Sequence, residues 1–266
     1  GTPLQGTGKR PVIRFCAPGQ VRLPDDPLMG PTMATLLDCQ RPEDRDPEWW
    51  IQETEAGQTA LLCRQNGVFR IHAAPGADGE ELAQFVRMAG FEAAQLPQEL
   101  APAFAALGCR VVERVLVEAP PSLPGGEPLV PLTAGQLEGV APTAFPAFAA
   151  RRDGGRWLWE FSRKARRGLA FAAGVQEAGE ILAAGAVTHR GTGRAVLGYI
   201  CCIPSCRGRG LGSRVVTGLA ARCAQEGEVP GLLCREELVP FYRRMDFVPI
   251  RTVWEAFPLP SADPQR

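Results

Sequence analysis

The stretch CRGRGLGSRVV, residues 206–216, decides how this chain is interpreted, because it places three glycines and three arginines between an apolar run and a helical pattern. The apolar run is RAVLGYICCIP (194–204), and residues 211–226 carry apolar side chains at helical spacing. A strand that passes through a glycine-rich turn into a helix presents unpaired backbone N–H groups at the positive end of the helix dipole. Such a turn attracts an anion, so the sequence predicts a cradle for a phosphate.

Three better-known phosphate loops do not fit this stretch. The dinucleotide pattern G-x-G-x-x-G would need glycine at Ser213, and the kinase loop fails at the same place. The Walker A loop is excluded because its Lys-Ser/Thr pair is missing, and GTGK near the N-terminus (6–9) lacks the Walker spacing. The pattern that fits is R/Q-x-x-G-x-G, over residues 207–212.

This pattern resembles the pyrophosphate loop of the GNAT superfamily, the N-acetyltransferases that use acetyl-coenzyme A. Further along the chain, PFYRRMDF (240–247) is similar to that family's segment with a tyrosine before Gly-Phe, although Asp246 stands where the family has glycine. The resemblance covers 169–257, and 128–168 more loosely. It implies an α/β (α+β) fold with a mixed, mostly antiparallel sheet flanked by helices.

The resemblance also implies roles for particular residues. The main chain around 201–203, at Cys202 and Ile203, would pair with the pantetheine arm of acetyl-CoA, and Tyr242 would protonate the departing thiolate as general acid. Backbone N–H groups of the loop would hold the pyrophosphate, from Arg207, Gly208, Arg209, Gly210, Leu211, Gly212 and Ser213. The implied reaction is direct attack of an amine on the thioester, in which the protein positions both partners and manages protons.

The general base is left unassigned. Many relatives carry a carboxylate on the strand before the loop, but 194–204 contains none. Substitutes are Glu236, Glu237, His189 and Glu160, each of which is also an ordinary surface or capping residue. The alternative to an enzyme is therefore a non-catalytic module that binds acyl-CoA as a sensor or for interaction.

The chain divides into two halves at a stretch rich in proline and glycine, APPSLPGGEP (119–128), which cannot run as a helix or a central strand. We expect a GNAT-like domain over 11–119, a linker over 120–127, and the GNAT domain over 128–258, with tails at 1–10 and 259–266. The first half predicts a hairpin (59–73) with an Asn66-Gly67 turn, a helix (78–89) with Asp78 as its N-cap, a strand (91–96), a helix (98–107) and a strand (109–118). The same order occurs in 180–257, and ELAPAFAALGC (99–109) aligns with ELVPFYRRMDF (237–247), so we expect a duplication.

The first copy is expected to be degenerate. Its loop, HAAPGADGEE (72–81), has no arginine and carries three carboxylates, which would repel a pyrophosphate. Phe104 aligns with Tyr242 and has no hydroxyl to donate. Its remaining role would be structural, or to form a wall of the acceptor pocket.

Composition limits the classes of partner. Lys plus Arg equals Asp plus Glu at 29 each, so no overall field favours nucleic acid or an anionic membrane. No apolar run approaches a membrane span. The nine cysteines lack C-x-x-C spacing, so we expect free thiols in a reducing cytoplasm and no metal site. The expected acceptor is a primary amine on a small molecule, or on a peptide or protein.

Overall fold

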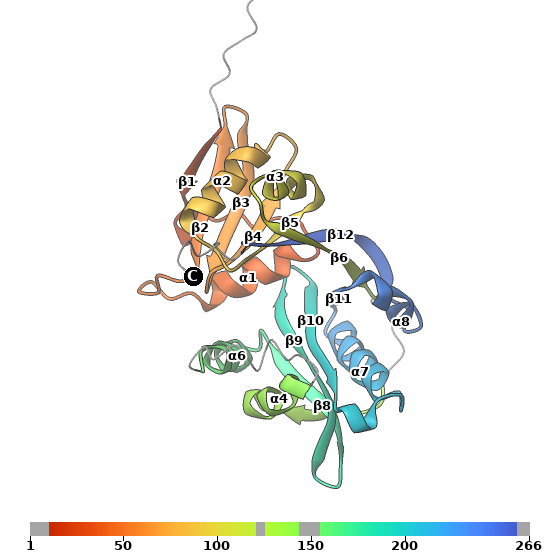
Figure 1. The fold of residues 1–266 in the computed structure, drawn as a ribbon. Helices are drawn as coiled ribbons and strands as arrows, with labels where there is room; N and C mark the ends of the chain where they lie inside the picture. Colours follow the sequence, from red (N-terminus) through yellow and green to blue (C-terminus); the bar gives the residue numbers. More distant parts are fainter. Residues whose placement is uncertain (1–10, 121–125, 144–154, 260–266) are drawn as a thin grey trace, which may run out of the picture. The chain divides into compact units, whose positions relative to one another are not determined.

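A computed structural model describes residues 11–120, 126–143 and 155–259 (Figure 1). The expected tail at 1–10, all of the tail expected at 259–266 except Leu259, and most of the expected linker lie outside the described residues. The chain forms two compact units. The first unit contains 11–24, Gln40–Arg114 and 252–259, and the second contains Asp25–Cys39 and Val115–Arg251.

The first unit contains a sheet in the order β1-β2-β3-β4-β5-β12. Its strands are antiparallel except for the parallel pair β4–β5. They are β1 (Val12–Phe15), β2 (Glu48–Thr54), β3 (Gly57–Gln65), β4 (Val68–Ala73), β5 (Ala93–Pro97) and the end of β12 (Val248–Phe257). The helices are α2 (Gly79–Ala89) and α3 (Ala101–Ala106), which bury Val86 and Phe104 against the sheet.

Local sequence chemistry explains the ends of these elements. The β3–β4 turn is Asn66-Gly67, where φ is 50° and 73°, as a two-residue type I′ hairpin requires. α2 begins at the N-cap Asp78, whose side chain accepts the N–H of Glu81. Both features are confirmed as the sequence predicted them.

The second unit contains a sheet in the order β6-β11-β10-β9-β8-β7. Only β10–β11 is parallel among the pairs that the described residues form in this sheet. The strands are β7 (Val130–Leu132), β8 (Phe171–Glu177), β9 (Glu180–Gly191), β10 (Arg194–Cys202), β11 (Val229–Cys234) and the end of β6 (Arg110–Glu118). The mixed, mostly antiparallel sheet that the sequence predicted is therefore confirmed.

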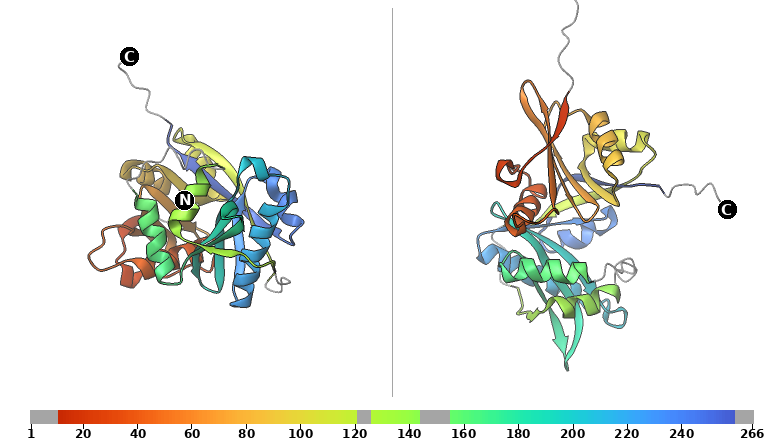
Figure 2. Two further views of the ribbon diagram at one scale, coloured as in Figure 1. Left: turned by 90° about the horizontal axis from the view of Figure 1, so that it is seen from below. Right: turned by 90° about the vertical axis from the view of Figure 1, so that its left-hand side faces the viewer.

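Helices cover both faces of this second sheet (Figure 2). Because successive side chains of a strand point to opposite faces, Ala173 and Ala183 pack in the core with α7 (Leu211–Gln225). Their neighbours Ala172 and Ala184 pack with α4 (Ala134–Val140) and α6 (Arg156–Arg166). The remaining helices of the unit are α1 (Met29–Cys39) and α8 (Val239–Arg243).

Gly185 lets α7 approach the sheet closely. A Cβ at this position of β9 would lie 2.6 Å from Ile200 Cδ1, 2.8 Å from Val215 Cγ1 and 3.0 Å from Leu219 Cδ1. A larger residue would require these side chains or α7 to shift, since the contacts of its Cβ would be closer than van der Waals distance. This packing thus sets the position of α7, the helix at the end of residues 207–213, which we call the Arg-Gly loop.

The compact units differ from the expected domains 11–119 and 128–258, because the last strand of each half pairs in the other unit. Residues 115–118 of β6 pair with 231–234 of β11, and 253–256 of β12 pair with 94–97 of β5. α1, which the sequence analysis did not predict, also belongs to the second unit, where the Thr35 hydroxyl exchanges two hydrogen bonds (2.9 and 2.8 Å) with the main chain of Arg190. A boundary read from proline and glycine content cannot reveal such pairings.

The element order repeats along the chain. β2-β3-β4-α2-β5-α3-β6 in the first half corresponds to β8-β9-β10-α7-β11-α8-β12 in the second. In both, a 3-10 turn (Gln98–Leu100 and Glu236–Leu238) precedes a short helix with proline near its start. This agreement supports the expected duplication.

Because the end of β6 pairs with β11, a substitution in β6 should destabilise the second unit, whereas one in α2 should destabilise the first. Val117 of β6 and Val86 of α2 are both 0% exposed, in the cores of the second and first unit respectively. Val117→Ala should destabilise the second unit by about 2 kcal/mol and speed amide hydrogen exchange in α7. Val86→Ala should instead speed exchange in β3 and β4. If Val117→Ala leaves exchange in α7 unchanged, β6 does not stabilise the second unit.

Candidate functional site

β10 and β11 part next to the Arg-Gly loop. They pair in parallel at three positions only, 194–196 with 229–231. Beyond Val196, β10 continues to Cys202 and β11 to Cys234 with no pairing between them in the described residues. A shift in the β9–β10 register between Gly198 and Cys201 places Tyr199 in a bulge, with φ of 54°. Backbone donors and acceptors on the parted strands are thereby available to an extended ligand.

The two residues expected to meet the pantetheine arm differ in their backbone hydrogen bonds. Ile203 N–H donates to Leu182 O (3.0 Å), and Ile203 O accepts the N–H of Cys206 (3.0 Å). Because backbone groups alternate in direction along a strand, the N–H of Cys202 faces away from β9, toward the gap. Of the two, Cys202 is therefore the residue whose N–H remains available.

The loop between β10 and α7 presents a row of backbone N–H groups. Gly208 and Gly210 have φ of 79° and 76°, a left-handed conformation that favours glycine. Arg207 N–H donates to Pro204 O, and the first bond inside the helix runs from Arg214 N–H to Gly210 O. Between them, the N–H groups of 208–213 make no hydrogen bond within the described residues, and no side chain caps α7. The predicted loop residues are thus brought together as an anion cradle requires.

Two of the three loop arginines are already paired with carboxylates. Arg209 Nη2 lies 3.0 Å from both oxygens of Glu177, with both side chains half-exposed. Arg214 Nε lies 2.5 Å from Glu127 Oε2. The two side chains form an ion pair, although their geometry does not make a hydrogen bond. These ion pairs neutralise part of the positive charge that the three arginines would otherwise give to the loop.

A cavity of about 400 Å³ lies against the loop. Its lining consists of Cys202, Cys206, Arg207, Gly208, Gly210, Leu211, Gly212, Ser213, Phe241 and Arg244. Burial raises the pKa of the Cys202 thiol, the neighbouring Cys206 acts in the same direction, and the charges of Arg207 and Arg209 oppose both. Most of the predicted cofactor residues therefore line one cavity, whereas Ile203 and Arg209 do not.

Phe241 and Arg244 line the same cavity but were missed by the sequence analysis. Both come from the α8 segment, one residue before and two residues after Tyr242. Their spacing of three places them on one face of a helical turn, and this is the signal that could have identified them.

Tyr242 is buried beside the parted strands. It belongs to the same core as Leu211 of α7 and Cys234 of β11, and its ring contacts those of Phe241 and Phe247 (centroids 5.0 and 5.9 Å away). Burial raises the pKa of the Tyr242 hydroxyl to about 12, and charge on Cys234 acts in the same direction. The phenol therefore keeps its proton at neutral pH.

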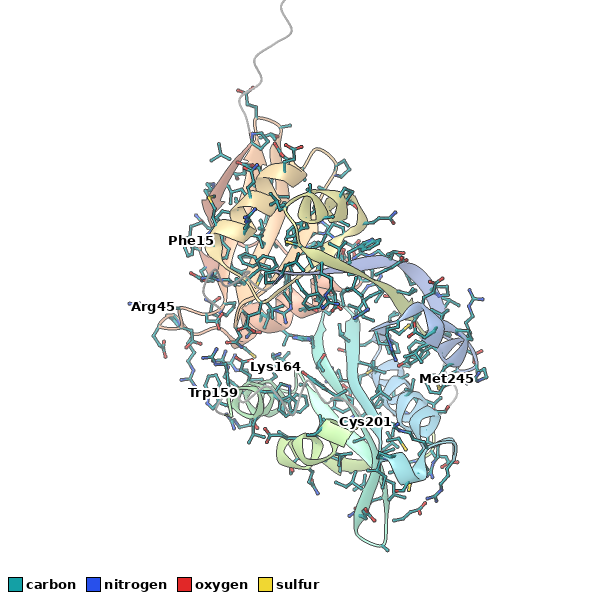
Figure 3. The ribbon with its side chains drawn as sticks, in the orientation of Figure 1. Phe15, Arg45, Trp159, Lys164, Cys201 and Met245 are labelled. Atoms are coloured by element: carbon teal, nitrogen blue, oxygen red, sulfur yellow. The ribbon has the colours of Figure 1, made fainter. Side chains whose placement is uncertain are left out.

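Two of the four residues considered as a general base, His189 and Glu237, form contacts away from the loop cavity. His189 Nε2 lies 3.0 Å from Lys164 Nζ, and its Nδ1 lies 3.0 Å from Thr188 Oγ1. Lys164 lies on α6, away from Cys201 on β10 (Figure 3). Glu237 pairs with Arg235 at 3.1 Å. No carboxylate lines the described part of the loop cavity.

The corresponding loop of the first half is filled by its own side chains. Asp78 caps α2 by accepting the N–H of Glu81 at 3.0 Å. Gln52, which is buried, accepts the N–H of Asp78 (2.9 Å) and donates to the Asp78 carbonyl (3.1 Å) and to a Glu81 carboxylate oxygen (2.6 Å). Carboxylates thus lie where an anion would bind, and the buried Phe104 stands at the place that Tyr242 has in α8.

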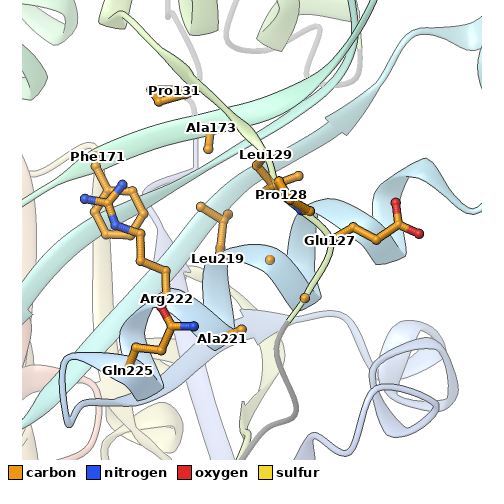
Figure 4. A pocket seen from close by; sticks show the side chains of 12 residues that line it. Glu127, Pro128, Leu129, Pro131, Phe171, Ala173, Leu219, Ala221, Arg222 and Gln225 are labelled. Atoms are coloured by element: carbon orange, nitrogen blue, oxygen red, sulfur yellow. The ribbon is translucent and has the colours of Figure 1, made fainter.

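A second cavity of about 250 Å³ lies in the second unit, against α7 (Figure 4). Leu129, Phe171 and Leu219 line it, and the Arg222 guanidinium lies 3.9 Å from the centroid of the Phe171 ring. None of its lining residues belongs to the predicted site, and it is separate from the loop cavity in the residues that line it.

The cysteines, the possible metal ligands and the helices of the described residues were compared with what other classes of site require. All nine cysteines are free, and six of them are buried. Within the described ranges, no group of three or more His, Cys, Asp or Glu could hold a metal ion. In the same part of the chain, every helix is too short or too polar to cross a membrane.

A comparison with protein families matched part of the second unit. Residues 138–247 match the family model described as "Acetyltransferase (GNAT) family". The comparison with curated proteins gave no match.

Solved structures resemble the chain over nearly its whole length. A GCN5-related N-acetyltransferase from Sphaerobacter thermophilus is 15% identical, with a TM-score of 0.58 over 93% of this chain and 95% of that one. A tandem GNAT protein from the clavulanic acid biosynthesis pathway is 15% identical, with a TM-score of 0.57 over 95% of this chain and 100% of that one. A GCN5-related N-acetyltransferase from Kribbella flavida is 16% identical, with a TM-score of 0.57 over 87% of this chain and 95% of that one. These likenesses establish the fold that both halves share.

The raised pKa of Tyr242 predicts a pH dependence of stability. The unfolded hydroxyl ionises near its ordinary value of 10 and the folded one at about 12, so the unfolded state loses its proton first. The stabilisation is therefore present below pH 10 and is lost as pH rises toward 12. Between pH 9 and 11, the free energy of unfolding should fall by about 1 kcal/mol more in the wild type than in Tyr242→Phe. Equal losses in the two proteins would show that Tyr242 ionises normally.

Proposed function

Since residues 138–247 are a GNAT acetyltransferase domain, we propose that the second unit is an acetyl-CoA-dependent N-acetyltransferase acting on a primary amine. Acetyl-CoA supplies a thioester whose acetyl carbon the amine attacks, so that a C–N bond forms and the C–S bond breaks. The protein's contribution is to hold the cofactor, orient the amine and manage protons.

The observation that carries this proposal is the row of N–H groups at 208–213, which have no partner within the described residues and face a cavity of about 400 Å³. A pyrophosphate is the group in CoA that satisfies several N–H donors at a helix N-terminus at once. Gly208 and Gly210 keep the backbone open to close approach, and Arg207 adds positive charge. The N–H of Cys202 would then meet an amide of the pantetheine arm along the edge of β10.

Tyr242 is proposed as the proton donor. Its hydroxyl stays protonated at neutral pH, and it lies in the same core as Cys234, where β11 ends beside the gap. It would donate a proton or a hydrogen bond to the sulfur as the C–S bond breaks. Proton loss from the amine is not assigned to a residue, because β10 carries no carboxylate.

The first half is proposed as a copy that no longer binds cofactor. Asp78 already accepts the N–H that an anion would need, and Phe104 has no hydroxyl. Its remaining contributions to the second unit are α1 and the end of β6. The acceptor would be a small-molecule amine, or an amine on a peptide or protein. Nine free thiols suit the reducing cytoplasm.

The absence of a carboxylate on β10 favours one alternative, a non-catalytic module that binds acyl-CoA. Such a module would keep the loop and lose turnover. Tyr242 distinguishes the two functions, because a sensor has no need of a proton donor at the sulfur.

Thiol labelling tests the cofactor site directly. Cys202 and Cys206 line the loop cavity, whereas Cys109, also partly buried, belongs to the first unit and serves as the internal control. At an acetyl-CoA concentration of about 100 times its Kd, alkylation of Cys202 and Cys206 by iodoacetamide should slow about tenfold or more, and that of Cys109 should not change. Acetyl-CoA is used because, unlike CoA, it has no free thiol to consume the reagent. Equal rates with and without acetyl-CoA would exclude the loop cavity as the cofactor site.

Tyr242→Phe tests whether the bound cofactor is turned over. In an enzyme, this variant should bind CoA with nearly unchanged Kd and release CoA thiol about 10²-fold more slowly in the presence of a reactive amine. The measurement is thiol release from acetyl-CoA with a panel of primary amines and amine-bearing peptides. Binding of CoA without thiol release from the wild type on any amine would favour the sensor.

A further inference from the structure

The loop cavity contains a second cation that does not belong to the Arg-Gly motif. Of the three loop arginines, only Arg207 lines the cavity, since Arg209 and Arg214 are paired with Glu177 and Glu127 outside its lining. The other cation in the lining is Arg244, which follows α8 directly. The positive charge facing the cavity therefore comes from two separate segments of the chain.

Arg244 is held by an aromatic ring. Its guanidinium carbon lies 5.5 Å from the centroid of Phe241, and the Phe241 ring reaches to within 3.9 Å of the position that a Cβ on Gly212 would take. Phe241 thus packs on the glycine loop and supports the guanidinium beside it. Such support lowers the conformational entropy that the arginine loses when it binds a ligand.

No carboxylate neutralises this arginine within the described residues. Arg244 is exposed and forms no ion pair there, and Asp246, the carboxylate closest to it in the sequence, is not its partner. An arginine whose planar guanidinium is oriented by a ring, lines a cavity and lacks an ion pair within the described residues is suited to a multiply charged anion such as a phosphate.

We propose that Arg244 binds a phosphate group of the CoA nucleotide, opposite the backbone N–H groups of the glycine loop. This inference rests on the proposed function, because it takes CoA as the occupant of the cavity. CoA carries phosphate in two places, the pyrophosphate and the ribose 3′-phosphate. The loop N–H groups and Arg244 would form two sides of one anion site, joined through Phe241.

Arg243 provides a matched control. It is the same residue type, is exposed, and belongs to α8 itself, but it does not line the cavity. Arg243→Gln and Arg244→Gln therefore change the net charge equally, and only Arg244→Gln removes a guanidinium from the cavity. Both residues are exposed, so neither variant should impair folding.

The experiment measures the Kd of CoA and of 3′-dephospho-CoA by calorimetry for the wild type, Arg243→Gln and Arg244→Gln. Arg244→Gln should weaken CoA binding by about tenfold or more, whereas Arg243→Gln should change it less than about twofold. If the loss disappears with 3′-dephospho-CoA, Arg244 binds the 3′-phosphate; if it persists, Arg244 binds the pyrophosphate. Either result supports the inference.

Two results would overturn it. Unchanged CoA binding by Arg244→Gln would show that the arginine does not reach the ligand. Equal weakening by the two variants would show that only the general positive field matters. Failure of the wild type to bind CoA is a separate outcome, since it would refute the proposed function and this inference together.

Discussion

The parting of β10 from β11 after Val196 is the constraint on which the rest of the second unit depends. Two neighbouring parallel strands would ordinarily satisfy each other's backbone groups along their whole length. Here pairing stops after three positions, and the bulge at Tyr199 redirects β10 toward the glycine loop. Close packing of α7 over Gly185 fixes the helix whose first N–H groups remain without partners. An open backbone edge and an open helix N-terminus therefore lie at the end of the same strand.

The two halves differ in what occupies the N-terminus of the helix after the loop. In the first half, β4 and β5 also pair in parallel at three positions, and β4 also leads through a loop into a helix. There the helix is capped by Asp78, and the buried Gln52 fixes that cap with three hydrogen bonds. In the second half, the N-cap is Gly210, which has no side chain to offer. The same order of strand, loop and helix thus gives a helix N-terminus capped by side chains in the first unit and one with unpartnered N–H groups in the second.

The α8 segment brings one core residue and two cavity residues together in one short turn. Tyr242 points into the core beside β11, while Phe241 and Arg244 line the loop cavity. Because the turn is anchored by the buried Tyr242, Met245 and Phe247, its two cavity residues are held by the core. A variant of the core residues would therefore disturb the loop cavity without lining it.

The sequence by itself determined the repeated order of elements, the Asn66-Gly67 turn, the Asp78 cap and the glycine loop, since each depends on residues close together in the chain. The resemblance in 207–212 and 240–247 pointed to the same family whose model matches residues 138–247. Only the tertiary structure decided which strand pairs with which: β6 with β11 and β12 with β5, and the placement of α1 against β9. It also decided which arginines face the cavity, because Glu127 and Glu177 engage Arg214 and Arg209, whereas Arg244 approaches from a distant helix. Pairings between residues far apart in the chain follow from packing, which local sequence patterns do not encode.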